Sequence, residues 1–215
     1  MGKRILLVEG KDDQHVIWNL CKVRGVPETF TVECPELKES EEDAGGIENL
    51  LDSIPARLDT SDLECLAAVI DANDKGASAR WQAIRDRLRN AGHAHIPETH
   101  SPAGTVVDLS DGIRFGVWVM PDNHSNGMIE DFVARMIRED DDMLIRVDDF
   151  LESIPEQKRR FTQKHQPKAR IHSWLAVQKE PGKPMGQAIG TKKYLNADKA
   201  IVQPFLDWIK NALIN

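Results

Sequence analysis

Short runs of hydrophobic residues, each followed by an acidic or turn-forming residue, recur along the chain and predict strands. Such runs fill most of Arg4–Val8, Cys65–Ile70 and Phe115–Met120, whereas Thr29–Cys34 alternates and is rich in β-formers. Continuous apolar runs of this length are typical of parallel strands that are buried on both faces. The pattern therefore predicts four strands, of which Arg4–Val8 and, by the same design, Cys65–Ile70 are central.

Between these strands the apolar positions change to helical spacing. Helices are predicted over residues 12–23, 47–58 with an interruption at Pro55, 77–90 and 128–137. Residues 36–46 are polar and acidic and predict a loop. The alternation of strand and helix is typical of a doubly wound α/β fold, with a mostly parallel sheet flanked by helices.

The strand pattern ends near Asp140. Beyond it, helices are predicted over residues 144–161 despite Pro155, over 171–177 and over 200–214, with a rigid loop at 180–186. We therefore expect an α/β domain over residues 1–140 and a helical, basic extension over residues 141–215 that packs on it.

Composition limits the class of protein. The chain has 215 residues, of which 40% are hydrophobic and 29% charged, as in ordinary globular proteins. It has neither an apolar run long enough to span a bilayer nor a signal-peptide pattern, which predicts a cytoplasmic protein with no membrane partner. Cys21, Cys34 and Cys65 are widely spaced, so we expect reduced core thiols. The oligomeric state stays open.

Charge is distributed unevenly. Residues 1–153 carry 16 Lys and Arg against 31 Asp and Glu, whereas residues 154–199 carry 11 against 3. The basic segment has Phe161 and Trp174 nearby, a composition that suits a track for the phosphates of DNA or RNA, although a solvated charged face has the same composition. The candidate phosphate-binding residues are Lys158, Arg159, Arg160, Lys164, Lys168 and Arg170.

Acidic residues follow three of the predicted strands. These residues are Glu9, then Asp71 and Asp74, then Asp122, Glu130 and Asp131. Ligands of open α/β sheets bind at the carboxyl ends of the strands, and clustered carboxylates suit Mg²⁺ or Mn²⁺. The alternative is that each acid caps a helix or lies in its first turn, and this alternative is strongest for Asp12, Asp13 and Asp131.

Two motifs resemble those of a known superfamily. Leu6-Leu7-Val8-Glu9-Gly10-Lys11-Asp12-Asp13 and Val69-Ile70-Asp71-Ala72-Asn73-Asp74-Lys75-Gly76 are similar to the first and second motifs of the Toprim fold. That fold is shared by topoisomerases, DnaG-type primases, recombination-mediator proteins and overcoming-lysogenization-defect nucleases. The resemblance covers residues 3–137 and implies a Toprim-like, Rossmann-like fold.

Further segments resemble an uncharacterised prokaryotic Toprim-like family of unknown function. They are Met120-Pro121-Asp122-Asn123, Gly127-Met128-Ile129-Glu130-Asp131 and Met185-Gly186-Gln187-Ala188.

The resemblance implies roles for individual residues. Glu9 matches a glutamate that acts as general acid or base or as a metal ligand, and Asp71 matches the first metal-binding aspartate. Asn73 stands where the family has a second aspartate, so Asp74 or Glu130 would have to compensate for the missing charge. Glu130 resembles an extra acid of nuclease-type members.

Other residues near the predicted site are weaker candidates. Lys11 and Lys75 are placed to contact a phosphate, and His124 could position a phosphate or a water. His93, His95 and His100 lack the spacing of a metal site, so we interpret them as surface residues.

Several mechanisms are not supported. The chain has no P-loop, which excludes a nucleotide-triphosphate motor, and no nucleophile elbow. Tyr194, its one tyrosine, lies outside the motifs, so covalent tyrosyl chemistry is not supported.

Three hypotheses follow. The first is a metal-binding hydrolase of the nuclease type that cleaves phosphodiesters in DNA or RNA with Mg²⁺ or Mn²⁺. The second is a nucleic-acid or nucleotide-binding module with a degenerate metal site, marked by Asn73. The third is a protein-interaction subunit that uses its acidic face.

Overall fold

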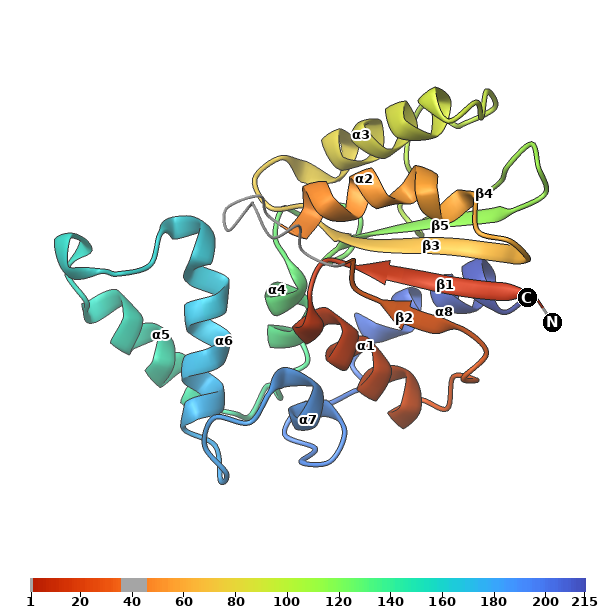
Figure 1. The fold of residues 1–215 in the computed structure, drawn as a ribbon. Helices are drawn as coiled ribbons and strands as arrows, with labels where there is room; N and C mark the ends of the chain where they lie inside the picture. The colour runs from red at the N-terminus through yellow and green to blue at the C-terminus, as the bar shows by residue number, and fades with distance from the viewer. Residues whose placement is uncertain (1, 36–45) are drawn as a thin grey trace.

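The computed structural model describes residues 2–35 and 46–215 and has helices on both faces of a five-stranded sheet (Figure 1). The strands are β1 (Lys3–Val8), β2 (Thr31–Glu33), β3 (Leu63–Asp71), β4 (Thr105–Asp108) and β5 (Arg114–Met120). Their order is β2-β1-β3-β5-β4, parallel except for the β4–β5 pair. The predicted α/β class with a mostly parallel sheet is thereby confirmed.

Eight α-helices occur in the described ranges. They are α1 (Lys11–Val23), α2 (Gly46–Leu58), α3 (Gly76–Asn90), α4 (Ile129–Ala134), α5 (Met143–Ser153), α6 (Gln166–Ala176), α7 (Met185–Ile189) and α8 (Val202–Leu213). Single 3-10 turns occupy Glu156–Lys158 and Gln163–His165. None of the helices in residues 2–35 and 46–215 has the length and apolar character needed to cross a membrane.

The two faces of the sheet bury separate cores because successive side chains of a strand point to opposite faces. In β1, Leu6 and Val8 pack into the core that includes α1 and α8, whereas Ile5 and Leu7 pack into the core under α2 and α3. Helix α8 lies close to the sheet at Gly116, where an added Cβ would stand 2.7 Å from the Cβ of Ala212. The last helix of the chain therefore completes one face of the central sheet.

The strand order reverses direction between β1 and β3, and this place is called the switch point of the sheet. From β1 the chain passes through α1 to β2 on one side, and from β2 through α2 to β3 on the other side. The loops after β1 and β3 diverge at this point, and open α/β sheets bind ligands at such a carboxyl edge. Glu9 follows β1 and Asp71 ends β3 at this edge.

The N-terminal elements depart from the predicted ones in three places. β4 was not predicted, because four residues at a sheet edge give too short a pattern. β2 covers only part of the predicted strand over 29–34. Helix α2 runs through Pro55 without interruption, and the predicted loop at 36–46 lies outside the described residues except for Gly46, which begins α2.

The predicted helices after residue 140 are corrected in three respects. The predicted helix over 144–161 is wrong beyond Ser153, because Ile154 and Pro155 have extended backbone angles and a proline disfavours helical geometry in the residue before it. Helix α6 begins at Gln166 rather than at residue 171. The predicted loop over 180–186 ends early because α7 begins at Met185.

Helices α5 and α6 and the turns between them, residues 143–176, project from the sheet and are called the arm (Figure 1). Helix α6 packs on α4, and Val147, Ile171 and Trp174 of the arm belong to the same core as α1 and α8. Helix α7 contacts α1 closely at Gly186, where an added Cβ would lie 2.6 Å from the carbonyl oxygen of His15. The arm is thus joined to the body by hydrophobic packing.

The three cysteines differ in burial. Cys21 and Cys65 are buried thiols, as expected, whereas Cys34 is only partly buried.

Candidate functional site

Glu9 and Asp71 meet at the carboxyl edge of the sheet. The parallel pairing of β1 with β3 sets Val8 opposite Val69, so the residues that follow each strand are also neighbours. The Asp71 N–H donates a hydrogen bond of 2.6 Å to Glu9 Oε1, and the Ile129 N–H donates one of 2.9 Å to Asp71 Oδ1. Two backbone amides thereby orient the two carboxylates that the motifs predicted to lie together.

Asp13 joins these acids. Although it lies in the first turn of α1, it makes no cap, and it is buried rather than solvated. Burial, reinforced by the charges of Glu9 and Glu130, raises the pKa of Asp13 to about 7. The alternative that Asp13 lies in the first turn of a helix is thus confirmed, but its burial beside other acids goes beyond that alternative. Its spacing from the buried Val16, Ile17 and Leu20 along the helix is the signal that could have identified it.

Glu130 in α4 is the fourth member, and we call Glu9, Asp13, Asp71 and Glu130 the acid cluster. Only 4% of Glu130 is exposed, and its Oε2 atom has no hydrogen-bond partner among the described residues. Its Oε1 atom lies 3.7 Å from the Nζ atom of Lys168 in α6. A buried carboxylate oxygen without a partner is costly, which points to a missing ligand or proton at this position.

The acids of the cluster have pKa values above their ordinary values. Burial raises the pKa values of Glu9, Asp71 and Glu130, and the negative charge of Glu9 adds to the increase at Asp71. The hydrogen bonds from the Asp71 and Ile129 amides oppose these increases. Three buried acids and one partly buried acid, all with raised pKa values at one edge of the sheet, are the pattern expected of a functional site rather than of surface helix caps.

Arg80 supports the cluster from α3 and was not predicted. It is buried, its Nε–H donates to the carbonyl oxygen of Asp71 over 2.9 Å, and its charge lowers the pKa of Glu9. Its spacing from the buried Ala77 and Ile84 places it on the inner face of the helix, which is a signal in the sequence that could have found it.

Asn73 and Asp74 lie beside the cluster rather than in it. Asn73 has a positive φ of 49° and forms an isolated bridge with Gly127, with Asn73 N–H donating over 2.7 Å. Its Oδ1 atom is buried without a partner in the described residues. A pocket of about 210 Å³ separates this loop from Gln163 and Lys164 of the arm. Asp74 lines the same pocket and is exposed, so it does not supply a buried charge.

Asp122 and Asp131 have structural roles. Asp122 accepts hydrogen bonds from the backbone of His124 and Ser125 and pairs with Arg135 at 2.6 Å. These contacts outweigh its partial burial and lower its pKa to about 2. Asp131 accepts the Met128 N–H over 2.9 Å and caps α4, as the capping alternative proposed.

His124 is exposed, and its Nδ1 contacts the backbone carbonyl of Asp122. Of the remaining histidines, His93 is buried against Ser110, which corrects its assignment to the surface.

Lys11 and Lys75 are exposed at the starts of α1 and α3. Lys11 lines a separate pocket of about 530 Å³ with Cys34, Asp52 and Arg57. Neither lysine forms an ion pair with the acid cluster in the described structure. Their placement next to the scissile phosphate remains a prediction.

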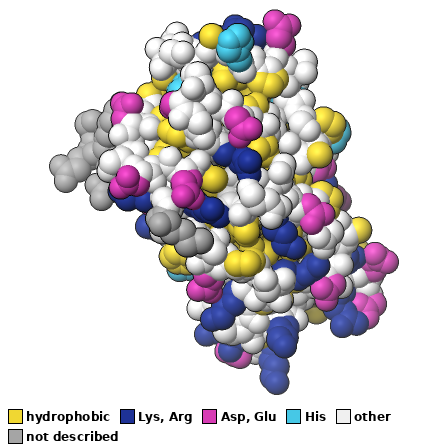
Figure 2. Space-filling view, turned by 90° about the vertical axis from the view of Figure 1, so that its right-hand side faces the viewer, with side chains coloured by type: hydrophobic (Ala, Val, Ile, Leu, Met, Phe, Trp, Pro, Cys, Tyr) yellow, Lys and Arg dark blue, Asp and Glu magenta, His cyan; other side chains and the backbone are white. Residues whose placement is uncertain are grey.

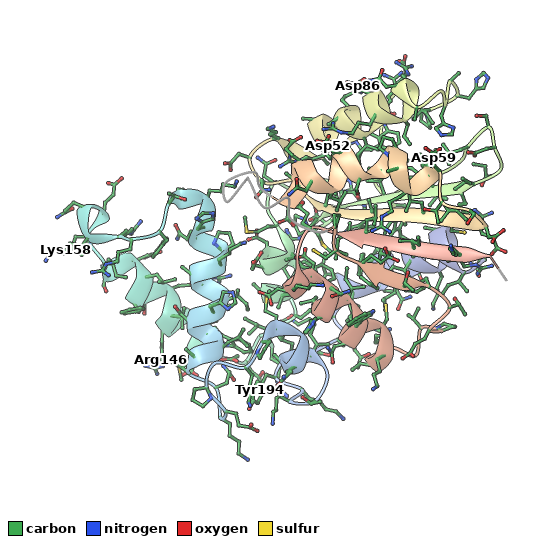
Figure 3. The ribbon with its side chains drawn as sticks, viewed as in Figure 1. Asp52, Asp59, Asp86, Arg146, Lys158 and Tyr194 are labelled. Carbon is green, nitrogen blue, oxygen red and sulfur yellow. The ribbon has the colours of Figure 1, made fainter. Side chains whose placement is uncertain are left out.

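The six basic candidates divide into three kinds. Lys168 faces the acid cluster, and Arg170 is held by Asp148 through two hydrogen bonds of 2.6 and 2.8 Å. Lys158, Arg159, Arg160 and Lys164 lie in the segment between α5 and α6. Figure 3 shows Lys158 at the outer end of the arm, pointing away from the sheet.

Positive charge is not confined to the arm. Lys and Arg side chains also gather on the lower part of the face seen in Figure 2, which is the side of the molecule away from the arm. Among the basic residues of the arm, Lys168 is distinguished by its ion pair with Glu130 of the acid cluster rather than by its charge alone.

The donor chemistry of the acid cluster fits a hard divalent cation. Carboxylate oxygens are the ligands that Mg²⁺ and Mn²⁺ prefer, and Glu130 Oε2 is buried without a partner among the described residues. In residues 2–35 and 46–215 no group of three or more His, Cys, Asp or Glu is arranged to hold a metal ion. The cluster therefore supplies suitable oxygens, and its side chains would have to rotate toward a shared ion.

The chain belongs to the family described as "protein of unknown function (DUF3226)", whose model matches residues 3–214. A search of curated proteins and a search of solved structures found no match.

Proposed function

We propose that this member of the family hydrolyses phosphodiester bonds in DNA or RNA, with Mg²⁺ or Mn²⁺ held by Glu9, Asp71 and Glu130. The observation that carries this proposal is the contact of Glu9 with Asp71 at the switch point, where the buried Glu130 lies beside them. Asp13 adds a fourth carboxylate within range of their charges. The same proposal includes a Toprim-like fold, which is more specific than the α/β class and is implied by the two motifs.

The residues of the cluster have the properties that hydrolysis needs. A bound ion would supply a Lewis acid that lowers the pKa of water and offsets negative charge on the phosphate. Glu9 is held by one oxygen, which leaves its Oε2 atom available to accept a proton from an attacking water. Because burial raises the pKa of Glu9 above its ordinary value, this carboxylate is suited to general acid or base catalysis.

The arm supplies positive charge for the substrate. Lys164 lines the pocket beside Asn73, and the ammonium group of Lys168 lies beside Glu130 of the acid cluster. A strand that crossed the cluster would meet these two ammonium groups next to the scissile phosphate, and Lys158 and Arg160 would contact phosphates farther along. Lysine is a point charge, so these contacts would bind the backbone without reading its sequence.

The proposal is tested by incubating the full chain with end-labelled single- and double-stranded DNA and RNA, with and without Mg²⁺ or Mn²⁺. We expect cleavage that requires the ion and is abolished in Glu9→Gln and Asp71→Asn. Asp74→Asn is the matched control, since it removes a nearby but exposed carboxylate. Cleavage by Glu9→Gln at the wild-type rate, or no cleavage of any substrate, would contradict the proposal.

A second candidate is a nucleic-acid or nucleotide-binding module without catalysis. Asn73 favours it, because an amide at this position brings no charge to an ion. The two candidates differ in one result: the binding module gives salt-sensitive binding of nucleic acid with no turnover at any ion concentration.

A further inference from the structure

Lys168 lies next to the acid cluster, beside Glu130. It lies in the first turn of α6, with its ammonium nitrogen 3.7 Å from Glu130 Oε1. Its side chain is 51% exposed, whereas that of Glu130 is 5% exposed. The ammonium group is therefore open to water on one side, whereas the carboxylate of its partner is buried.

The charge of Lys168 acts on most of the cluster. It lowers the pKa values of Glu9, Asp13 and Glu130, against the larger increase that burial causes at each. Arg80 also acts on Glu9, but its Nε–H is committed to the Asp71 carbonyl. Lys168 is thus a counter-ion of the cluster that can leave without disrupting a buried hydrogen bond.

One ammonium group does not neutralise the four carboxyl groups of the cluster, three of which belong to buried residues. Glu130 Oε2 has no partner in the described part of the chain although Lys168 lies beside Oε1. A divalent cation would bring twice the charge to the same oxygens and could bind several of them at once. The positive charge of the ammonium group at Oε1 would repel a divalent ion at the same carboxylate, so the two cations oppose each other's binding to Glu130.

We infer that Lys168 competes with the divalent cation for Glu130, so that binding of the ion releases the ammonium group toward the phosphate of the substrate. This inference rests on the proposed function, because it assumes that the cluster binds the ion. It assigns Lys168 a positioning role that ordinary phosphate-binding residues of the arm do not have. Since Lys168 belongs to α6, occupation of the cluster also becomes coupled to the position of this helix.

Competition has a measurable consequence for the ion alone. If Lys168 occupies the site most of the time, the apparent dissociation constant of Mn²⁺ exceeds the intrinsic one by the inverse of the open fraction. Isothermal titration calorimetry of the full chain with MnCl₂, in the absence of nucleic acid, measures this constant. We expect Lys168→Met to bind Mn²⁺ about five- to tenfold more tightly than the wild type does.

Two matched variants separate competition from the general effect of removing a positive charge. Lys164→Met removes a neighbouring lysine of the arm that lines the pocket near Asp131 instead of pairing with Glu130, and should change the affinity less than about twofold. Lys168→Arg keeps the charge and should stay near the wild type. Equal gains for Lys164→Met and Lys168→Met would contradict competition.

A double-mutant cycle locates the competition at Glu130. In Glu130→Gln the carboxylate that holds Lys168 is absent, so adding Lys168→Met should give little further gain. A gain as large as in the wild-type background would show that Lys168 acts elsewhere, and would overturn the inference.

The calorimetry distinguishes failure of the inference from failure of the proposed function. Mn²⁺ that binds the wild type and Lys168→Met equally, but not Asp71→Asn, would overturn the inference and leave the metal site intact. Binding of Mn²⁺ to none of the variants, including Lys168→Met, would overturn both. Circular dichroism of each variant confirms that it is folded.

Discussion

The acid cluster and the basic segment of the arm, which together carry the proposed function, are built in opposite ways. Three of the four acids are buried and Glu9 is partly buried, and the β1–β3 ladder and two backbone amides fix the positions of Glu9 and Asp71. The lysines and arginines between α5 and α6 lie in 3-10 turns and loops, and most are exposed. The fold thus gathers four mutually repelling carboxyl groups at one edge of the sheet. The basic side chains, in contrast, are spread over the surface of the arm.

This difference predicts different responses to mutation. A buried carboxylate with one defined position should be irreplaceable, because no neighbour can take over its geometry. An exposed lysine in a group should be replaceable, because each contributes one weak, screened contact.

The largest expected effect is at Asp71. Asp71→Asn removes one charge at a ligand position while keeping an oxygen that can accept the Ile129 N–H. We expect the rate of metal-dependent cleavage to fall more than about 100-fold, since even residues that only support metal ligands change activity about 10- to 100-fold. Asp74→Asn, measured in the same assay, should retain activity within about threefold. Comparable decreases in both variants would contradict the distinction between buried and exposed acids.

The second prediction concerns pH and Asp13. In the unfolded chain this group titrates near 3.8, whereas burial raises its pKa to about 7 in the folded protein. Between these values the folded state binds more protons, so its contribution to the free energy of unfolding falls as pH rises through this window. Asp13→Asn should therefore raise the free energy of unfolding at pH 8 by at least about 1 kcal/mol, since one pKa unit corresponds to about 1.4 kcal/mol.

Urea denaturation at pH 5 and pH 8 measures this effect. The wild type should lose more stability than Asp13→Asn between the two values, and the exposed neighbour Asp12 provides the control variant Asp12→Asn. A decline with pH that is the same in all three proteins would contradict the raised pKa of Asp13.

A smaller effect is expected on the arm. Replacing Lys158, Arg160 and Lys164 by Ala should weaken binding of duplex DNA and flatten its salt dependence, by about 0.9 in the slope of log affinity against log salt for each phosphate that the variant no longer binds. Fluorescence anisotropy at several salt concentrations measures both quantities. The triple variant should still fold, because the three side chains are exposed. An unchanged slope would identify the segment as an ordinary charged surface.

The smallest effect is expected at Asn73. Asn73→Asp should tighten Mn²⁺ binding several-fold, because it adds a charge beside the cluster and Asp tolerates the left-handed backbone conformation that Asn73 adopts. Calorimetry with MnCl₂ tests this change. Weaker binding in the variant would show that repulsion from the neighbouring Asp74 and Asp131 exceeds the attraction to the ion.

The sequence predicted the parts of the fold whose pattern is local. The apolar runs that end at Glu9 and Asp71 identified β1 and β3, and their parallel pairing follows from burial on both faces. β4 and the extended break at Ile154 were missed, since a four-residue edge strand and a single proline have weak patterns. The helix boundaries of the arm depended on that break.

The same distinction holds for the site. The neighbouring positions of Glu9 and Asp71 could be predicted because strand ends in a parallel sheet share an edge. Lys168 and Glu130 are 38 positions apart in the sequence and lie on different helices. Their pairing depends on the tertiary packing of α6 on α4, which no local pattern indicates. Asp13 and Arg80 could have been found from the inward-facing stripes of their helices.

The most direct test of the account is a crystal of the full chain grown with MnCl₂, measured where manganese scatters anomalously. The account predicts an anomalous peak among the carboxylates of Glu9, Asp71 and Glu130, about 2.0–2.6 Å from an oxygen of each, with the Lys168 ammonium displaced from Glu130. A peak elsewhere on the molecule, or none at saturating Mn²⁺, would contradict the claim that the acid cluster forms a metal site.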